Sequence, residues 1–260
     1  MITDHTCPVC QKEYLRDGGY ITPETGLVEV RLTIEPITIA KCLHGHRTVL
    51  AILDGGYALL FERALQRLVT GNTRDAAIDA YTALEIYLSH VPARARYHRE
   101  GGASPRQLRQ EMEAVSKYAE RSLGAALAII SVMTGAPPPR FDADRTTKLR
   151  NRAVHAGYYP TEPEAEALCV EVERTVSEVD KRFEAIPCVN QMTYWEAAIN
   201  EEIASLRERL GVRDLPTVLA HFGTVLASNR APNRSTGTLE RTIRQYREDA
   251  AEDFTSWRVW

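Results

Sequence analysis

The pattern of apolar residues changes at Gly55-Gly56, and this change limits what the 260-residue chain can fold into. Before it, residues 26–39 are rich in β-branched side chains that largely alternate with polar ones, a pattern that predicts strands. Residues 48–53 predict one more short strand. After it, apolar residues recur at helical spacing. The sequence therefore predicts a small β module followed by a mainly α-helical body.

The helical part divides at residues that start or stop helices. Thr73 can cap one helix, and Asp142 or Asp144 can cap another that ends near Gly157. Thr161 begins a capping box that opens a further helix. Residues 92–102 and 229–237 predict loops, because they are polar or rich in turn formers. Helices are expected over residues 57–68, 74–88, 105–133, 145–156, 161–183, 194–210, 215–228 and 239–254.

Two short segments of the β module carry side chains that bind transition metals. The first is Cys7-Pro8-Val9-Cys10, and the second, about 30 residues later, is Cys42-Leu43-His44-Gly45-His46. Zinc takes four thiolate or imidazole ligands in a tetrahedron, and two tight turns joined by strands can supply two each. The preferred ligands are Cys7, Cys10, Cys42 and His46, with His44 as the alternative to His46.

Four protein ligands leave no position open for water, so the expected Zn²⁺ is structural and not catalytic. The alternatives without metal are a reduced Cys-x-x-Cys pair and a redox pair. A redox pair usually starts a helix in a βαβ unit, which the sequence around Cys7 does not predict. The expected organisation is a zinc ribbon-like β module over residues 1–54, a helical bundle over 55–188 and a C-terminal helical extension over 189–260.

Charge and apolar content limit the classes of function. The formal net charge is −3, so any contact with nucleic acid must come from a local basic patch. No apolar run reaches the roughly 18 residues of a membrane span, and residues 1–5 lack the pattern of a signal peptide. Five cysteines fit metal binding in a reducing cytoplasm better than a set of disulfides, so a cytoplasmic location is expected.

The most informative polar stretch is Arg150-Asn151-Arg152-Ala153-Val154-His155, near the predicted end of a helix. Helical geometry places Asn151 and His155 on one face, while Arg150 lies about 140° away from His155. A histidine can transfer protons near neutral pH, and an arginine can hold a phosphate with a forked contact. The alternative is a charged, solvent-exposed helix face held by salt bridges.

This stretch resembles the motif of the HEPN superfamily, in which an arginine, commonly followed by a polar residue, precedes a histidine by a short helical interval. Here the motif is Arg150-Asn151 followed by His155. Residues 156–165 resemble the family's turn into its final helix, and residues 76–88 resemble an early helix of its bundle. The resemblance covers roughly residues 56–184.

The resemblance implies a bundle of four or five helices that dimerises, so that two motifs form one composite cleft. Active members cleave RNA without a metal and use the ribose 2′-OH as the nucleophile. His155 would take or give the proton, Arg150 would hold the scissile phosphate, and Asn151 would orient the pair or the sugar. Glu85 could orient Arg150 or His155 from the facing helix.

Further RNA contacts are expected close to the motif. Residues 140–152 are locally basic and could follow a phosphate backbone, with Lys148 and Arg152 as the contacts and Tyr158 beside them. Residues 94–99 form a second basic segment, in which Tyr97 lies among arginines and could stack on a base.

The sequence leads to one expected function and two alternatives. The expected function is a metal-independent endoribonuclease that acts on RNA as a homodimer or higher homo-oligomer, in phage defence or as a toxin, with a possible regulatory protein partner. The first alternative is a non-catalytic HEPN module that binds nucleotide or a partner. The second is a zinc-ribbon adaptor that recruits protein or nucleic acid, with the helices as an assembly platform. P-loop, dinucleotide-binding and hydrolase-elbow motifs are absent.

Overall fold

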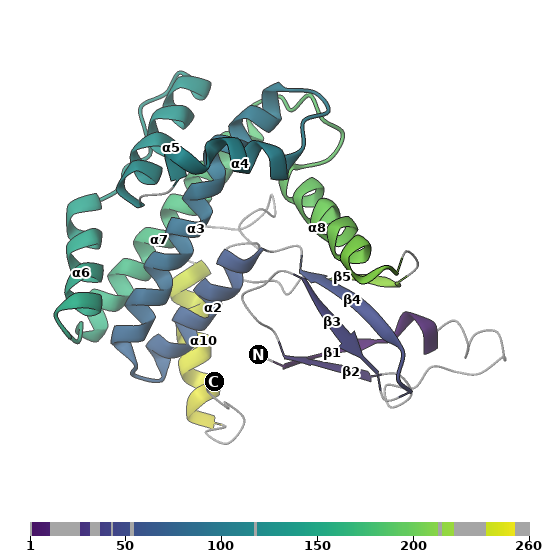
Figure 1. Cartoon of the computed structure of the whole chain (residues 1–260). Helices are drawn as coiled ribbons and strands as arrows, with labels where there is room; N and C mark the ends of the chain where they lie inside the picture. The colour runs from purple at the N-terminus through teal and green to yellow at the C-terminus, as the bar shows by residue number, and fades with distance from the viewer. Residues whose placement is uncertain are drawn as a thin grey trace. The chain divides into compact units, whose positions relative to one another are not determined.

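A computed structural model describes residues 2–10, 27–31, 37–42, 44–52, 55–116, 119–212, 215–220 and 238–252. The chain is mainly α-helical, as the sequence predicts, with small sheets (Figure 1). It divides into two compact units. The first contains Met1–Gly56 and Trp195–Phe222, and the second contains Tyr57–Tyr194 and Gly223–Val259. No helix within the described ranges has both the length and the apolar character needed to cross a membrane.

The first unit contains the strands. Strands β1 (Ile2–Thr6) and β2 (Leu27–Arg31) form an antiparallel pair. Strands β3 (Ile37–Lys41) and β4 (Arg47–Ile52) are also antiparallel, with Ile39 opposite Val49. Strand β5 (Thr217–Ala220) joins β4 in parallel, which gives the order β3-β4-β5. Within the described residues, the predicted strands are confirmed as β2, β3 and β4, whereas β1 and β5 are strands that the sequence did not predict.

Helix α8 (Tyr194–Leu210) supplies the apolar cover for β4. Val49 and Ala51 of β4 form a buried cluster with Ile199 and Ile203 of α8 and with Leu215. Because the two α8 residues are four positions apart, they lie on one face of the helix. This cluster is the described core of the first unit.

The predicted helix over residues 215–228 is wrong at its start, where the structure has β5. A short apolar run fits a buried strand as well as a buried helix, and periodicity alone does not separate them. Pairing with β4 decides the outcome: the Val49 N–H donates to the Pro216 carbonyl at 2.8 Å. Residues 221–237 lie outside the described ranges. Residues 189–260 also do not form one separate extension, because α8 and β5 complete the first unit.

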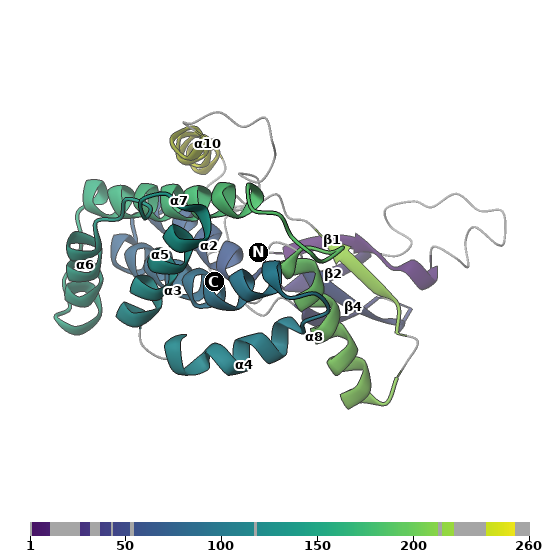
Figure 2. The same ribbon diagram turned by 90° about the horizontal axis from the view of Figure 1, so that it is seen from above.

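The second unit is built around one long helix, α3 (Thr73–Arg99). Helix α3 packs against α7 (Glu162–Glu184) on one side and against α4 (Pro105–Ser116) on the opposite side (Figure 2). The other helices of this unit are α2 (Gly56–Val69), α4 (Pro105–Ser116), α5 (Ala119–Thr134), α6 (Ala143–His155), α7 (Glu162–Glu184) and α10 (Thr238–Glu252).

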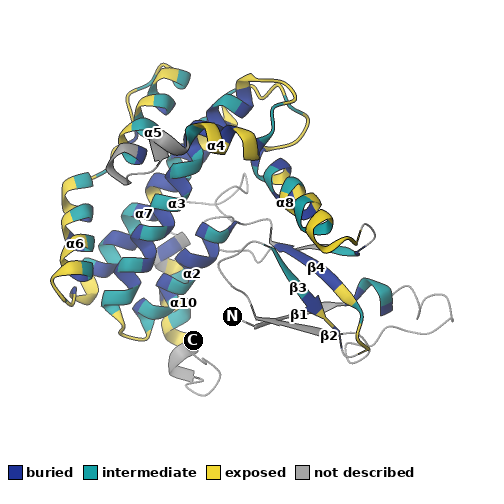
Figure 3. Cartoon of the chain, in the orientation of Figure 1, coloured by how far each residue is buried: buried dark blue, intermediate teal, exposed yellow. Residues whose placement is uncertain are grey.

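The core of the second unit runs along α2, α3 and α7, where many residues are coloured as buried in Figure 3. It includes a buried polar group. The Tyr87 hydroxyl donates to the Asp180 carboxylate at 2.8 Å, and Arg94 forms an ion pair with the same carboxylate. The Arg94 guanidinium carbon lies 4.0 Å from the centroid of the Phe183 ring. Burial, together with the Asp180 charge, raises the pKa of Tyr87 well above its usual value.

The predicted loop over residues 92–102 is wrong, because α3 continues through Pro92 to Arg99. An internal proline removes one helical hydrogen bond. Burial outweighs that cost here: Pro92 and Tyr97 are both buried, and the Tyr97 hydroxyl donates to the Met192 carbonyl at 3.2 Å. Tyr97 is therefore part of the core and does not offer a ring for base stacking.

Helix ends follow the expected chemistry with two corrections. Asp142 caps α6, and Thr161 with Glu164 forms the predicted capping box of α7. Helix α3 is capped by the Asn72 side chain, not by Thr73, which is its first residue. The predicted helix over residues 105–133 is two helices, α4 and α5.

Candidate functional site

The first candidate site is the cluster of cysteine and histidine side chains in the first unit. Ligand atoms of Cys7, Cys10, Cys42 and His46 all lie within 4.8 Å of one another, and the three thiols are buried. These are the four side chains that the sequence predicts, and they could hold a metal ion.

The spacing of the donor atoms fits a tetrahedral metal. Metal–sulfur bonds of about 2.3 Å and metal–nitrogen bonds of about 2.0 Å give tetrahedron edges of about 3.8 Å for S···S and about 3.5 Å for S···N. The Cys10 and Cys42 sulfurs are 3.8 Å apart. The His46 Nδ1 lies 3.3 Å from the Cys10 sulfur and 4.0 Å from the Cys7 sulfur. Three thiols and one imidazole are a ligand set typical of structural metal sites.

A tight turn brings the second pair of ligands together. The Gly45 N–H donates to the Cys42 carbonyl at 2.9 Å, and the Cys42 N–H donates to the His46 carbonyl at 3.0 Å. Gly45 has a φ of 86°, a conformation that favours glycine. His44 is exposed, and although its Nδ1 is 3.3 Å from the Cys10 sulfur, it is not one of the four mutually close ligands.

The charges of this cluster also favour a cation. Burial raises the pKa of Cys10, and the neighbouring Cys42 and Cys7 sulfurs add to this effect. Burial acts in the same direction on Cys7, but backbone N–H groups of Cys10 and Val9 outweigh it and lower the Cys7 pKa. Buried thiols this close cannot all ionise unless a positive charge lies between them, and a bound metal ion supplies that charge.

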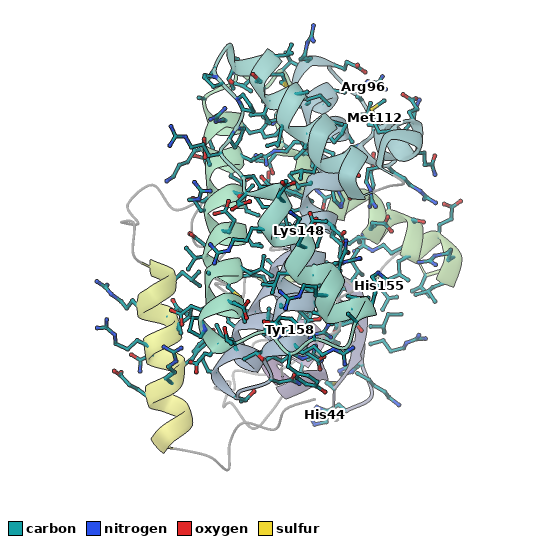
Figure 4. All side chains as sticks on the ribbon, turned by 90° about the vertical axis from the view of Figure 1, so that its left-hand side faces the viewer. His44, Arg96, Met112, Lys148, His155 and Tyr158 are labelled. Carbon is teal, nitrogen blue, oxygen red and sulfur yellow. The ribbon has the colours of Figure 1, made fainter. Side chains whose placement is uncertain are left out.

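The second candidate site is the exposed face of α6 in the second unit. Thr146, Leu149 and Ala153 bury one face of this helix. Asn151 and His155 are exposed on the other side, as their four-residue spacing predicts. Lys148, His155 and Tyr158 lie along the side of the molecule that faces the viewer in Figure 4.

Arg150 lies at the border between these two faces and turns toward α3. Its Nη1 donates to the Asn151 Oδ1 at 3.0 Å, and its Nη2 lies 3.8 Å from the Glu85 carboxylate. Its guanidinium carbon is 5.8 Å from the centroid of the Tyr81 ring. The side chains of Arg150 and Glu85 are 28% and 23% exposed, so this ion pair is partly shielded from water. The Tyr81 hydroxyl is itself held 2.9 Å from the Thr147 hydroxyl.

The same surroundings shift the pKa of Glu85. Burial raises its pKa above the usual value, and the nearby Arg150 partly opposes this shift. The predicted contact between Glu85 and Arg150 is present. Glu85 does not contact His155, which has no hydrogen-bond or ion-pair partner among the described residues.

A single copy of the chain does not bring Arg150 and His155 together. The helix separates their directions by about 140°. The Arg150 guanidinium contacts Glu85 of α3 and Asn151, and no hydrogen bond joins it to His155 among the described residues. One chain therefore presents an exposed histidine and a separately held arginine.

The predicted RNA contacts differ in how accessible they are. Lys148 is exposed. Arg152 is also exposed, and its guanidinium carbon lies 3.6 Å from the centroid of the half-buried Tyr158 ring. The Tyr158 hydroxyl donates to Glu164 at 2.8 Å, and the pKa of Glu164 is lowered by the Thr161 N–H and by this hydroxyl.

Two residues near the motif have contacts that the sequence did not predict. The Arg74 Nε donates to the Ala153 carbonyl at 2.9 Å, near the end of α6. Tyr159 is 70% exposed, and the Arg74 guanidinium carbon lies 5.7 Å from the centroid of its ring. Tyr159 directly follows Tyr158, but periodicity does not indicate which of two adjacent loop tyrosines faces solvent. Arg74 is far away in the sequence and gives no local signal.

Comparisons with known proteins provide no relative: no family model, no curated protein and no solved structure matches this chain.

Proposed function

We propose that this chain is a metal-independent endoribonuclease of the HEPN type. The observation that carries the proposal is the arrangement on α6. His155 is exposed beside Asn151 and has no partner among the described residues, while Arg150 is held at the helix border by Glu85 and Asn151. A general acid or base must be accessible, and a phosphate-binding arginine benefits from being held in position before substrate binds.

Arg150 keeps donors for a substrate in this arrangement. A guanidinium carries five N–H donors, and its contact with Glu85 is long, at 3.8 Å. A phosphate oxygen can therefore bind the same guanidinium while Glu85 and Asn151 fix its plane. The proposed role of Glu85 is positioning, through Arg150.

The proposed reaction is transfer of the phosphate within the RNA strand. A neutral His155 accepts the proton of the ribose 2′-OH, and the 2′ oxygen attacks the adjacent phosphorus. The bond from phosphorus to the 5′ oxygen of the next nucleotide breaks, and that oxygen takes a proton from a protonated histidine. The products are a 2′,3′-cyclic phosphate and a 5′-hydroxyl, and no metal takes part.

Two copies of the chain supply what one copy lacks. The reaction needs one group that accepts a proton and another that donates one, and in this proposal both groups are histidines. Each chain offers a single His155, about 140° from its own Arg150 around the helix. We therefore propose a composite site between two copies, as the resemblance to HEPN proteins implies.

The test is cleavage of total RNA and tRNA by protein supplied with zinc, in buffer free of Mg²⁺. The proposal expects the wild-type chain to cleave RNA. The cleavage rate should fall at least about 100-fold in His155→Ala and in Arg150→Ala, because the first removes a general base and the second a contact with the transition state. Arg109→Ala is the control, because Arg109 is an exposed arginine on α4, outside the basic stretch over residues 140–152. Wild-type protein that cuts no RNA, or His155→Ala that cuts normally, would contradict the proposal and favour a non-catalytic binding module.

For the cysteine and histidine cluster we propose structural Zn²⁺ held by Cys7, Cys10, Cys42 and His46. The donor set and its spacing support zinc, and four protein ligands leave no position for a reacting water. When bound, the ion would supply the positive charge that lets the buried thiols ionise together. Cys42→Ser is expected to reduce the zinc content measured by elemental analysis, while RNA cleavage by the α6 site does not need this ion for chemistry.

A further inference from the structure

The loop after α6 carries two adjacent tyrosines with opposite surroundings. Tyr158 is covered by Arg152, and its hydroxyl is bound to Glu164. Tyr159 keeps 70% of its surface exposed. Among the tyrosines, phenylalanines and tryptophans of the described ranges, only Tyr159 is exposed. A single exposed apolar side chain is common on protein surfaces, so exposure alone does not indicate a site.

The backbone on both sides of Tyr159 is held in place. Gly157 adopts a φ of 62°, and the Tyr158 N–H donates to the Arg152 carbonyl at 3.1 Å. On the other side, the Thr73 hydroxyl donates to the Pro160 carbonyl at 2.6 Å. These bonds tie the loop to the end of α6 and to the start of α3. The Tyr159 ring is thus presented to solvent from a fixed loop, which lowers the entropy cost of stacking a ligand on it.

A cationic group lies over one face of this ring. The Arg74 guanidinium carbon is 5.7 Å from the centroid of Tyr159, and the Arg74 Nε is bound to the Ala153 carbonyl. No further hydrogen bond or ion pair of Arg74 occurs within the described ranges, so its two terminal nitrogens can bind an anion. The geometry places an exposed aromatic face and a fixed, partly unpaired guanidinium next to each other.

A nucleotide matches this combination, because it joins a flat base to an anionic phosphate. Bases stack on aromatic side chains, and arginine binds phosphate. A base inside a duplex already has both faces covered, so only an unpaired base can use the ring. We infer that Tyr159 and Arg74 form a subsite for one unpaired nucleotide of RNA, with the base on Tyr159 and the phosphate on Arg74.

This inference rests on the proposed function and names its substrate class. Tyr159 lies four residues after His155, in the loop that ends α6. A nucleotide held there would lie in the same strand as the scissile phosphate, a short distance away. The substrate would then be single-stranded RNA or an RNA loop, and duplex RNA of the same sequence would bind poorly.

The test is binding of a fluorescent single-stranded oligonucleotide of about ten nucleotides, within the usual site size of such proteins. It is measured by anisotropy with RNA and with DNA of the same sequence. The DNA lacks the 2′-OH and cannot be cut, so binding is measured apart from cleavage. Tyr159→Ala is expected to raise the Kd roughly tenfold, as the loss of one stacked base does, and Tyr159→Phe should bind as the wild type does.

Arg74 is tested through the dependence of binding on salt. Each phosphate contact with a single strand contributes about 0.7 to the slope of log Kd against log salt concentration, so Arg74→Ala should lower that slope by this amount. Arg109→Ala removes an equally charged, exposed residue of α4, outside both basic segments, and should leave the slope unchanged. Arg74→Lys retains the charge and should therefore keep the salt dependence of the wild type. This variant separates the effect of the charge from the effect of losing the hydrogen bond to the Ala153 carbonyl.

The outcomes separate this inference from the ribonuclease proposal. Binding that depends on Tyr159, without RNA cleavage, would support the subsite and contradict the enzyme. RNA cleavage with equal Kd values for wild type and Tyr159→Ala would overturn the subsite and leave the enzyme. Equal binding of duplex and single strand, or no binding of either, would also overturn the subsite.

Discussion

His90 is a single residue whose protonation should govern the acid stability of the second unit. Its Nδ1 lies 3.0 Å from the Tyr194 hydroxyl, and burial, helped by the charge of Arg109, lowers its pKa from 6.5 to about 3. In the unfolded chain the imidazole takes up a proton below pH 6.5, while in the folded chain it stays neutral. The stability from neutral His90 is therefore complete above pH 6.5 and is lost as the pH falls toward about 3.

Between pH 6.5 and about pH 4.5 this residue alone should lower the free energy of unfolding by roughly 2–3 kcal/mol. Urea unfolding at several pH values measures the effect. The variant His90→Gln cannot take up the proton, so its stability should decrease less over the same range. Equal pH dependence of wild type and His90→Gln would show that His90 does not have this effect.

His44 and His46 offer a matched pair of substitutions at the metal cluster. His46 Nδ1 is part of the set of four close ligands, whereas His44 is exposed and outside that set. His46→Ala should therefore reduce the zinc content of the purified chain, and His44→Ala should leave it near one ion per chain. Elemental analysis combined with a thiol titration measures both variants. The opposite result would make His44 the ligand.

For single residues, the sequence predicted those site residues that lie close together along the chain. The four possible metal ligands come as two short segments, so Cys7, Cys10, Cys42 and His46 could be named from the sequence, and the structure brings them together. The environment of Arg150 is a different case. Its contact with Glu85 could be proposed only by assuming that the two residues lie on facing helices. The proposed subsite at Tyr159 depends on Arg74, at the start of a helix far away in the sequence, and no local pattern indicates that the two residues meet.

At the scale of elements, the end of α6 depends on one glycine. Gly157 has a φ of 62°, and a Cβ added there would meet no atom within 4 Å. Gly157→Ala should therefore destabilise the chain through backbone strain alone, by about 1–2 kcal/mol. Gly101 is a matched control, because a Cβ there also meets nothing within 4 Å and its φ is not in the left-handed region.

Gly101→Ala is expected to be neutral or slightly stabilising, because alanine reduces the freedom of the unfolded chain. Chemical denaturation of the two variants gives the comparison. If both substitutions have the same effect, the conformation of Gly157 does not limit the stability of this loop.

The elements that the sequence mispredicts are those decided by distant contacts. Pro92 and the surrounding basic residues have the composition of a loop, yet Tyr97 is held by the Met192 carbonyl and Arg94 by Asp180, and α3 continues. In the same way, β5 forms because β4 offers it hydrogen bonds. By contrast, capping signals act within a few residues: the capping box at Thr161 was predicted, and Asp142 was one of two predicted caps of α6.

At the scale of the whole molecule, the chain order does not match the order of the compact units. The first unit takes β5 and most of α8 from a region that follows the bundle. Ile203 of α8 is 5% exposed and packs in the cluster that contains Val49. The integrity of the unit that carries the cysteine and histidine cluster therefore depends on residues far along the chain, after the bundle.

Two isoleucine substitutions test this division. Ile203→Ala should cost about 2–5 kcal/mol, as large-to-small changes in cores do, and the loss should fall on the first unit. Ile130 of α5 is fully buried, and Ile130→Ala should cost a similar amount in the second unit. Hydrogen exchange resolves the two: β4 amides should exchange faster in Ile203→Ala, and α3 amides in Ile130→Ala. If either variant accelerates exchange equally in β4 and α3, the two units unfold as one, because their stabilities would then be coupled.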